Sequence, residues 1–230
     1  MPSNITGTDR MKENDISIGI VSDVVCPWCY IGKHRFDAAI DTLKSDNSLD
    51  VSFQVEWQPY ELNPTMPMSG MSRNEYGARK FGSEKKAHEF YKAIEESALA
   101  EGIEMDVNKI QTTPNSRAAH ALIEVAKQSN RQNQVLDALF KAYFVHGKDI
   151  GAFSVLEEIA DTFALILPIT DRRERLTSLD NYIAKESKKS AELGVHGVPS
   201  FFYNKKFLFS GAQSTETVIL SVKKAIRRGL

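Results

Sequence analysis

The stretch Cys26-Pro27-Trp28-Cys29 contains the only two cysteines of this chain, and it decides how the sequence around it is interpreted. The apolar run over residues 16–21 precedes it and predicts a buried strand. A helical pattern follows it, with one apolar face formed by Ile31, Phe36, Ala39, Ile40 and Leu43. The cysteines therefore lie where a strand meets a helix, and Pro27 fits the first helical position, where a missing N–H is harmless.

This position gives the two cysteines different expected properties. The dipole and the unpaired N–H groups at a helix start stabilise a thiolate, so we expect the pKa of Cys26 to fall below that of a free thiol. We also expect Cys26 to be exposed, and Cys29, one turn further on, to be shielded. A disulfide that closes so short a loop gains little stability from loop closure. The pair therefore fits a reversible disulfide better than a structural one.

The cysteine pair has two alternative interpretations, a zinc site and a pair of buried cysteines without chemistry. A CxxC pair can form half of a zinc site, but such sites usually need two further ligands of matching spacing. The histidines are scattered singly along the chain, at His34, His88, His120, His146 and His196. Two buried cysteines without any chemistry are the other alternative. The strand–CxxC–helix context favours redox chemistry over both, and we expect no metal site.

Composition excludes several classes of partner. The chain has 230 residues, of which 42% are hydrophobic, and Lys+Arg 29 against Asp+Glu 30 gives a net charge of −1. This balance argues against binding to nucleic acid or to an anionic membrane, and no apolar run is long enough to span a bilayer. Residues 1–15 are polar without the pattern of a signal peptide, which predicts a mobile extension. With only two cysteines, we expect a reducing, cytoplasmic setting.

The chain then divides into two flanking parts and a long central block. Residues 49–57 alternate as a strand does, which completes a parallel β-α-β unit, and the strand is expected to be cut by Pro59. Helical stripes follow over residues 83–100, 115–126, 135–144, 155–163 and 176–193. Two aromatic strands at 200–203 and 206–210, joined by a turn at Asn204-Lys205, precede a helix capped by Ser214. We predict a thioredoxin-like domain from residues 16–60 and 194–230, and a helical insertion domain over 61–193.

Several motifs together resemble the DsbA family of thioredoxin-fold proteins, most closely its FrnE-like branch. They are the segments 22–33, Glu61-Leu62-Asn63-Pro64, 80–82, Arg117-Ala118-Ala119-His120, 139–144, 194–202 and 210–213. The resemblance covers nearly everything from Ile16 to the C-terminus. It implies an α/β thioredoxin fold, β-α-β…β-β-α with a mixed four-stranded sheet, that carries a large all-helical insertion.

The resemblance also implies roles for single residues. Cys26 is the expected nucleophile and Cys29 the resolving thiol, with Pro27 and Trp28 between them. Pro199 is similar to the cis-proline that lies opposite the motif in thioredoxin folds, so the backbone of Val198 is expected to pair with substrate. Trp28 is equally consistent with an apolar platform for substrate and with simple packing. Asp23, Lys33, His34 and His196 flank these residues without an assigned role.

The expected function is a thiol–disulfide oxidoreductase acting on protein or small-molecule disulfides. Its redox centre is a Cys26–Cys29 disulfide, with no bound prosthetic group and with glutathione as a candidate electron partner. One alternative is a glutathione-dependent isomerase or kappa-class transferase on the same fold, related to 2-hydroxychromene-2-carboxylate isomerase. Those relatives have a serine where Cys26 stands, so the retained pair favours dithiol chemistry. The other alternative is a non-catalytic binding module.

Overall fold

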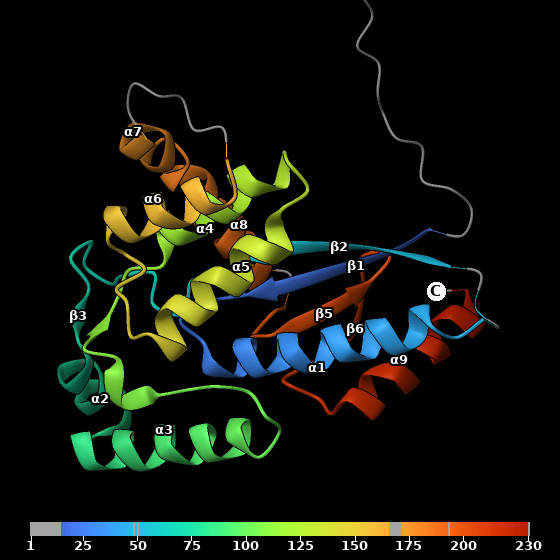
Figure 1. Ribbon diagram of the computed structural model, residues 1–230, viewed down its shortest axis with the longest axis horizontal. Coiled ribbons are helices and arrows are strands. Elements are labelled where there is room, and N and C mark those ends of the chain that lie inside the picture. Colours follow the sequence, from blue (N-terminus) through green and yellow to red (C-terminus); the bar gives the residue numbers. More distant parts are fainter. Residues whose placement is uncertain (1–14, 48, 50, 166–171, 193, 230) are drawn as a thin grey trace, which may run out of the picture.

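A mixed sheet of four strands forms the centre of the molecule (Figure 1). The computed structural model describes residues 15–229 except 48, 50, 166–171 and 193. The strands are β1 (Asp15–Ser22), β2 (Ser52–Pro59), β5 (Ser200–Tyr203) and β6 (Lys206–Ser210), in the order β2-β1-β5-β6. β1 runs parallel to β2 and antiparallel to β5, and β5 runs antiparallel to β6. The predicted four-stranded thioredoxin-like sheet is confirmed.

Helices cover both faces of this sheet. α1 (Pro27–Lys44) and α9 (Thr215–Arg228) lie side by side on one face, as Figure 1 shows. On the other face, α5 (Gln132–Phe140) and α8 (Asp180–Glu192) contact β2, and α4 (Arg117–Lys127) packs against both of these helices. One continuous apolar core joins the sheet to the helices of the insertion. The active-site end of α1 is therefore enclosed by segments from both parts of the chain.

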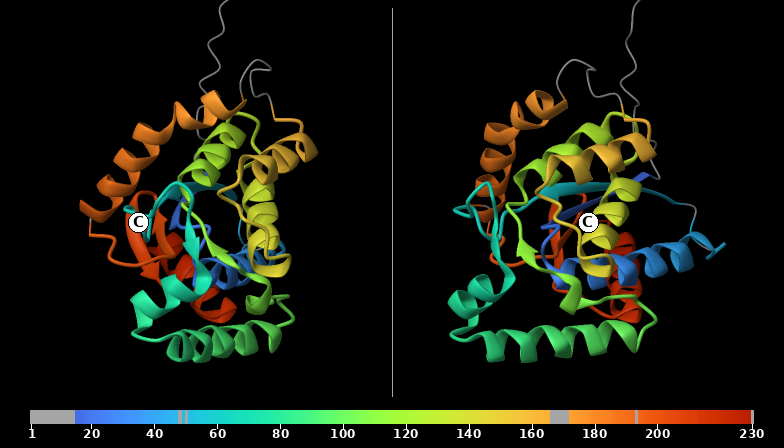
Figure 2. Two further views of the ribbon diagram at one scale, coloured as in Figure 1. Left: turned by 90° about the vertical axis from the view of Figure 1, so that its left-hand side faces the viewer. Right: turned by 60° about the vertical axis from the view of Figure 1, so that its left-hand side comes forward.

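The rest of the insertion is helical apart from one short pair of strands. Its remaining elements are β3 (Met71–Ser72), α2 (Arg73–Phe81), α3 (Glu84–Leu99), the 3-10 turn η1 (Val107–Lys109), β4 (Thr112–Thr113), the π-helical turn η2 (Lys141–Val145), α6 (Phe153–Thr162) and α7 (Arg172–Thr177). β3 and β4 pair with each other, away from the main sheet. Figure 2 shows α3 at the opposite end of the molecule from α7 and α8.

Local sequence signals explain several element boundaries. The Ser83 hydroxyl accepts a hydrogen bond from the Lys86 N–H at the start of α3, and the Ser214 hydroxyl does the same for Thr217 in α9. Asn204 and Lys205 both have positive φ angles, 46° and 66°, as a two-residue hairpin turn between β5 and β6 requires. The predicted Ser214 cap and Asn204-Lys205 hairpin are confirmed, and the Ser83 cap is a further signal that the structure reveals.

The structure also departs from the expected boundaries. β2 begins at Ser52, later than the predicted run from residue 49, and it ends at Pro59, where the sequence predicts the cut. Because β2 is an edge strand, a last residue without an N–H is tolerated. α2, β3 and β4 have no counterpart among the predicted elements. The predicted extension over residues 1–15 lies outside the described residues, except for Asp15, which begins β1. No helix in the described part of the chain has the length and hydropathy needed to cross a membrane.

Candidate active site

Cys26 is the N-cap residue of α1, and its backbone has the extended conformation typical of that position. Its carbonyl oxygen accepts hydrogen bonds from the N–H groups of Cys29, at 3.0 Å, and Tyr30, at 3.2 Å. Pro27 occupies the first turn, so no helical hydrogen bond is lost there. Both cysteines are free thiols in this structure. The predicted strand–CxxC–helix arrangement is confirmed.

The expected exposure of Cys26 is wrong. Its side chain is only 6% exposed, because the loop before β5 covers it and the Val198 carbonyl oxygen lies 3.7 Å from its sulfur. Cys29 is fully buried, as expected. Trp28 lies between them and is 36% exposed, so the outer edge of the motif is apolar and faces solvent.

The buried sulfur of Cys29 strongly favours its protonated form. Desolvation raises the pKa of the Cys29 thiol well above 9.0, and a hydrogen bond with Cys26 acts in the same direction. The nearby Ser22 hydroxyl and the Asp23 N–H lower this pKa in part, since both can donate to a thiolate. The two cysteines thus touch each other, and Cys29 needs a proton acceptor before it can act as a nucleophile.

The loop before β5 packs against the Cys26 sulfur and against α1. The peptide bond between Val198 and Pro199 is cis, which is the geometry that the sequence resemblance implies. Pro199 also contacts α1, at Gly32, where an added Cβ would come within 2.9 Å of the proline Cγ. The structure therefore brings Cys26, Cys29, Val198 and Pro199 together.

Asp23 lies fully buried directly before the motif and organises the residues around it. Its Oδ1 accepts hydrogen bonds from the Val25 N–H and from His120 Nε2, each at 3.3 Å. Its Oδ2 accepts a hydrogen bond from the Leu62 N–H at 2.8 Å, and this bond holds the loop after β2 next to the motif. His120 comes from α4 in the insertion and is buried. Sequence analysis missed this role because the two residues are 97 positions apart, although His120 belonged to one of the supporting motifs.

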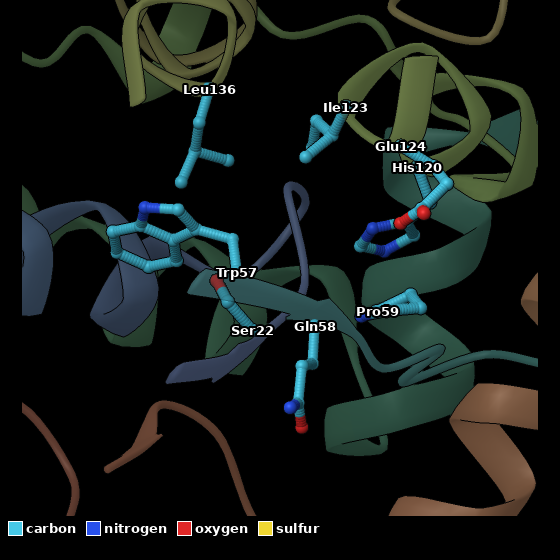
Figure 3. Close-up of a pocket in the computed structure, with 8 residues that line it drawn as sticks. All are labelled: Ser22, Trp57, Gln58, Pro59, His120, Ile123, Glu124 and Leu136. Atoms are coloured by element: carbon cyan, nitrogen blue, oxygen red, sulfur yellow. The ribbon is translucent and has the colours of Figure 1, made fainter. Parts of the chain in front are cut away.

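A small cavity lies beside these residues, between β2 and the helices α4 and α5 (Figure 3). Its volume is about 10 Å³, and its lining residues are Ser22, Trp57, Gln58, Pro59, His120, Ile123, Glu124 and Leu136. Ser22 Oγ is buried and has no hydrogen-bond partner of normal geometry among the described residues. Figure 3 shows this hydroxyl and the His120 imidazole at the wall of the same space.

The other residues that flank the motif in the sequence lie elsewhere. Lys33 is 1% exposed, and its Nζ lies 2.5 Å from Asp37 Oδ2 on the same helix and 2.7 Å from Asp137 Oδ1 on α5 of the insertion. His34 packs against the Tyr30 ring, and burial lowers its pKa. His196 is exposed. Within the described residues, no cluster of three or more metal-ligating side chains is present.

An open groove of about 640 Å³ lies along the loop that Asp23 fastens. Its lining consists of residues 62–67 together with Met71, Tyr76, Arg79 and Lys80. The lining mixes apolar side chains with Arg79, which pairs with Glu75, and Lys80, which donates to the Tyr76 hydroxyl. The groove begins at Leu62, the residue bonded to Asp23.

Comparison with known proteins gives one family and several similar structures. The family described as "DSBA-like thioredoxin domain" matches residues 17–221. The crystal structure of a probable DsbA oxidoreductase from Streptomyces coelicolor is 25% identical, with a TM-score of 0.78, and the match covers 92% of this chain and 90% of that one.

Two further structures have the same fold at lower identity. A 2-hydroxychromene-2-carboxylate isomerase is 13% identical with a TM-score of 0.66, and the match covers 93% of this chain and 97% of that one. The cytosolic disulfide reductase DsbM from Pseudomonas aeruginosa, solved with GSH, is 15% identical with a TM-score of 0.62, over 92% and 99% of the two chains.

Proposed function

Because this chain belongs to the DSBA-like thioredoxin domain family, we propose that it is a thiol–disulfide oxidoreductase that works through Cys26 and Cys29. The observation that carries the proposal is the asymmetry of the pair at the start of α1. Cys26 caps the helix under the Val198 carbonyl, whereas Cys29 is fully buried with a raised pKa. Such a pair can divide attack and resolution between two sulfurs.

In the reductive direction, the Cys26 thiolate attacks one sulfur of a substrate disulfide R–S–S–R′. The bond from Cys26 to R–S forms, the S–S bond breaks, and R′–S⁻ leaves and takes up a proton. Cys29 then loses its proton and attacks Cys26, which releases R–S⁻ and leaves the Cys26–Cys29 disulfide. Two electrons pass from the dithiol to the substrate.

Substrate recognition is assigned to the loop before β5 and to the rim of the motif. The Val198 backbone lies beside the Cys26 sulfur, where it can pair with an extended substrate segment. Trp28 offers an exposed apolar surface next to the sulfurs, and the groove lined by residues 62–67 gives space for a longer peptide. The proposed substrates are protein or small-molecule disulfides, not nucleic acid or membrane.

Glutathione is the proposed electron partner, and the cytoplasm the proposed location. Support comes from the shared fold of a cytosolic disulfide reductase solved with GSH, together with a cysteine content that suits a reducing compartment. We further propose that the chain belongs to the FrnE-like branch, on the motifs around residues 22–33 and 194–202.

The test uses the wild type, Cys26→Ser and Cys29→Ser in the reduction of a disulfide-bonded peptide, with dithiothreitol and then glutathione as the electron source. We expect turnover by the wild type, no attack by Cys26→Ser, and a trapped covalent mixed disulfide with Cys29→Ser, seen by mass spectrometry. Full turnover by Cys29→Ser with both electron sources would refute resolution by Cys29. It would favour the glutathione-dependent isomerase chemistry suggested by the fold shared with the chromene-carboxylate isomerase.

A further inference from the structure

Under the proposed function, the resolving step releases the proton of Cys29, and the group that accepts this proton has not yet been identified. Cys29 must lose a proton before it can attack, yet its sulfur is fully buried and has no direct path to solvent. Its neighbours Cys26, Ser22 and the Asp23 N–H cannot serve as the final acceptor. Cys26 is already bonded to substrate at this step, and the other two are donors or relays.

His120 is the nearby group that has an available basic site. Its Nε2 contacts Asp23 Oδ1 at 3.3 Å, which fixes Nε2 as the protonated nitrogen beside a carboxylate and leaves Nδ1 as an acceptor. Asp23 itself is a poorer acceptor, because its two oxygens already receive the N–H groups of Val25 and Leu62 as well as His120.

Ser22 and His120 both line the cavity whose residues are drawn in Figure 3. A water molecule needs roughly 10–15 Å³ and at least two polar partners to occupy a buried site. The cavity measures about 10 Å³, and its wall carries the unpartnered Ser22 hydroxyl and the His120 ring. Ser22 also lies close enough to Cys29 to lower the pKa of that thiol, so the cavity wall includes a hydroxyl near the resolving sulfur.

We propose that His120, held by Asp23, accepts the Cys29 proton through the Ser22 hydroxyl and one water molecule in this cavity. The proton moves from Cys29 Sγ to Ser22 Oγ as the Ser22 proton moves to the water, and the water passes a proton to His120 Nδ1. The thiolate then attacks Cys26, the substrate–Cys26 bond breaks, and the departing thiolate takes up a proton. His120 returns to neutral by releasing its proton to solvent.

Other charged groups face this pair from the elements packed against it. Glu124 lines the cavity one turn along α4, and burial raises its pKa, which makes it the rival acceptor. Arg117, at the start of α4, is bonded to Glu61 at 2.9 Å, so that cation and carboxylate neutralise each other. The buried Tyr143 phenol has a pKa raised to about 12 and stays neutral in the working range.

The test separates attack from resolution in one experiment. The reduced protein is mixed with a chromogenic aromatic disulfide in a stopped-flow instrument, and the released thiol is followed over a range of pH. The first phase reports attack by Cys26 and the second reports resolution by Cys29. The first variant is His120→Gln, which keeps an N–H donor for Asp23 but cannot take up a proton. Ser22→Ala removes the hydroxyl between Cys29 and the cavity, and Glu124→Gln tests the rival acceptor.

We expect His120→Gln to slow the second phase by on the order of 10²-fold, the usual effect of losing a proton acceptor, with the first phase unchanged. The wild-type second phase should level off at a lower pH than that of the variant, in which the rate keeps rising until the thiol itself ionises. Ser22→Ala should show the same selective loss, which provides the answer if His120→Gln does not fold. Glu124→Gln should leave both phases as in the wild type.

An unchanged second phase in either His120→Gln or Ser22→Ala would overturn the proposal, and so would equal slowing of both phases, which indicates a purely structural role. Selective slowing in Glu124→Gln alone would move the acceptor to that residue. Release of only one thiol by the wild type would instead refute the proposed function, because resolution would not occur at all.

Discussion

Gly32 and Pro199 are in direct contact, so that a Cβ added at position 32 would lie 2.9 Å from the proline Cγ and 3.4 Å from the Ala212 Cβ. Gly32 lies in the first turns of α1, and Pro199 in the loop that covers the Cys26 sulfur. The distance between the redox helix and this loop therefore depends on the absence of a side chain at one residue.

Gly32→Ala should destabilise the protein, although alanine is favoured over glycine in a helix by roughly 1 kcal/mol. Overpacking against a rigid proline ring usually costs about 1–3 kcal/mol, so we expect a net loss of about 1 kcal/mol. Urea unfolding measures this change. Gly197→Ala, in the same loop but with open space around it, is the control and should not lose stability. A Gly32→Ala protein more stable than the wild type would show that the loop moves away without cost.

Alkaline pH should destabilise the reduced protein through Cys29. Its folded-state pKa is raised above 9.0, so the folded state binds the thiol proton more tightly than the unfolded chain does. This contribution is complete below the unfolded pKa and is lost as the pH rises from there towards the folded pKa, by at most ~1.4 kcal/mol per pH unit. Tyr91 and Tyr143 act in the same direction, but only above the ordinary tyrosine value of 10.0.

The measurement is the free energy of unfolding of the reduced wild type between about pH 8 and 9, where unfolded thiols titrate and tyrosines stay mostly protonated. Cys29→Ser is the matched control, and its stability should fall less over this interval. Parallel curves for the two proteins would mean that Cys29 does not have a raised pKa.

Lys33→Met should be strongly destabilising. The Lys33 ammonium is buried between Asp37 and Asp137, and it joins α1 to α5 of the insertion. Removal of one partner of a fully buried ion pair costs about 3–5 kcal/mol, and we expect about 2–3 kcal/mol here because both aspartates retain some solvent contact. Adding Asp137→Asn should recover part of the loss.

The control for this prediction is Lys85→Met on α3, because Lys85 is exposed and lies 4.0 Å from Glu89. A surface pair of this kind contributes about 0–1 kcal/mol. Urea unfolding of the three variants measures the difference. Equal effects at positions 33 and 85 would contradict a buried role for the Lys33 charge.

Trp28→Ala should impair substrate binding. The indole is 36% exposed beside the sulfurs, so its removal should lower the free energy of unfolding by about 1–2 kcal/mol, less than the ~3–5 kcal/mol usual for a fully buried tryptophan. For a disulfide-bonded peptide we expect KM to rise several-fold with kcat little changed. Phe207→Ala, an exposed aromatic residue on β6, is the control and should leave KM unchanged. A normal KM in Trp28→Ala would leave Trp28 with a packing role only.

Local patterns in the sequence were sufficient to predict the framework of the fold. The strand before Cys26, the helix after it, the Asn204-Lys205 turn and the Ser214 cap each depend on residues a few positions apart. Strand and helix periods, turn chemistry and capping act over that range, so the sequence alone carries them. The short strands β3 and β4 were missed because two residues are too few to show a period.

Sequence patterns therefore predict the frame of the fold and the position of the sulfur pair within it. Three features emerge only from the packing of distant segments: the Val198 carbonyl beside Cys26, 172 residues away, the burial of Lys33, and the contact between His120 and Asp23. Sequence periodicity does not predict whether a charged residue or a single histidine is buried, or which residue it contacts. These properties arise when distant segments pack together and remove water, which sets the pKa of Cys29 and the route by which it can lose its proton.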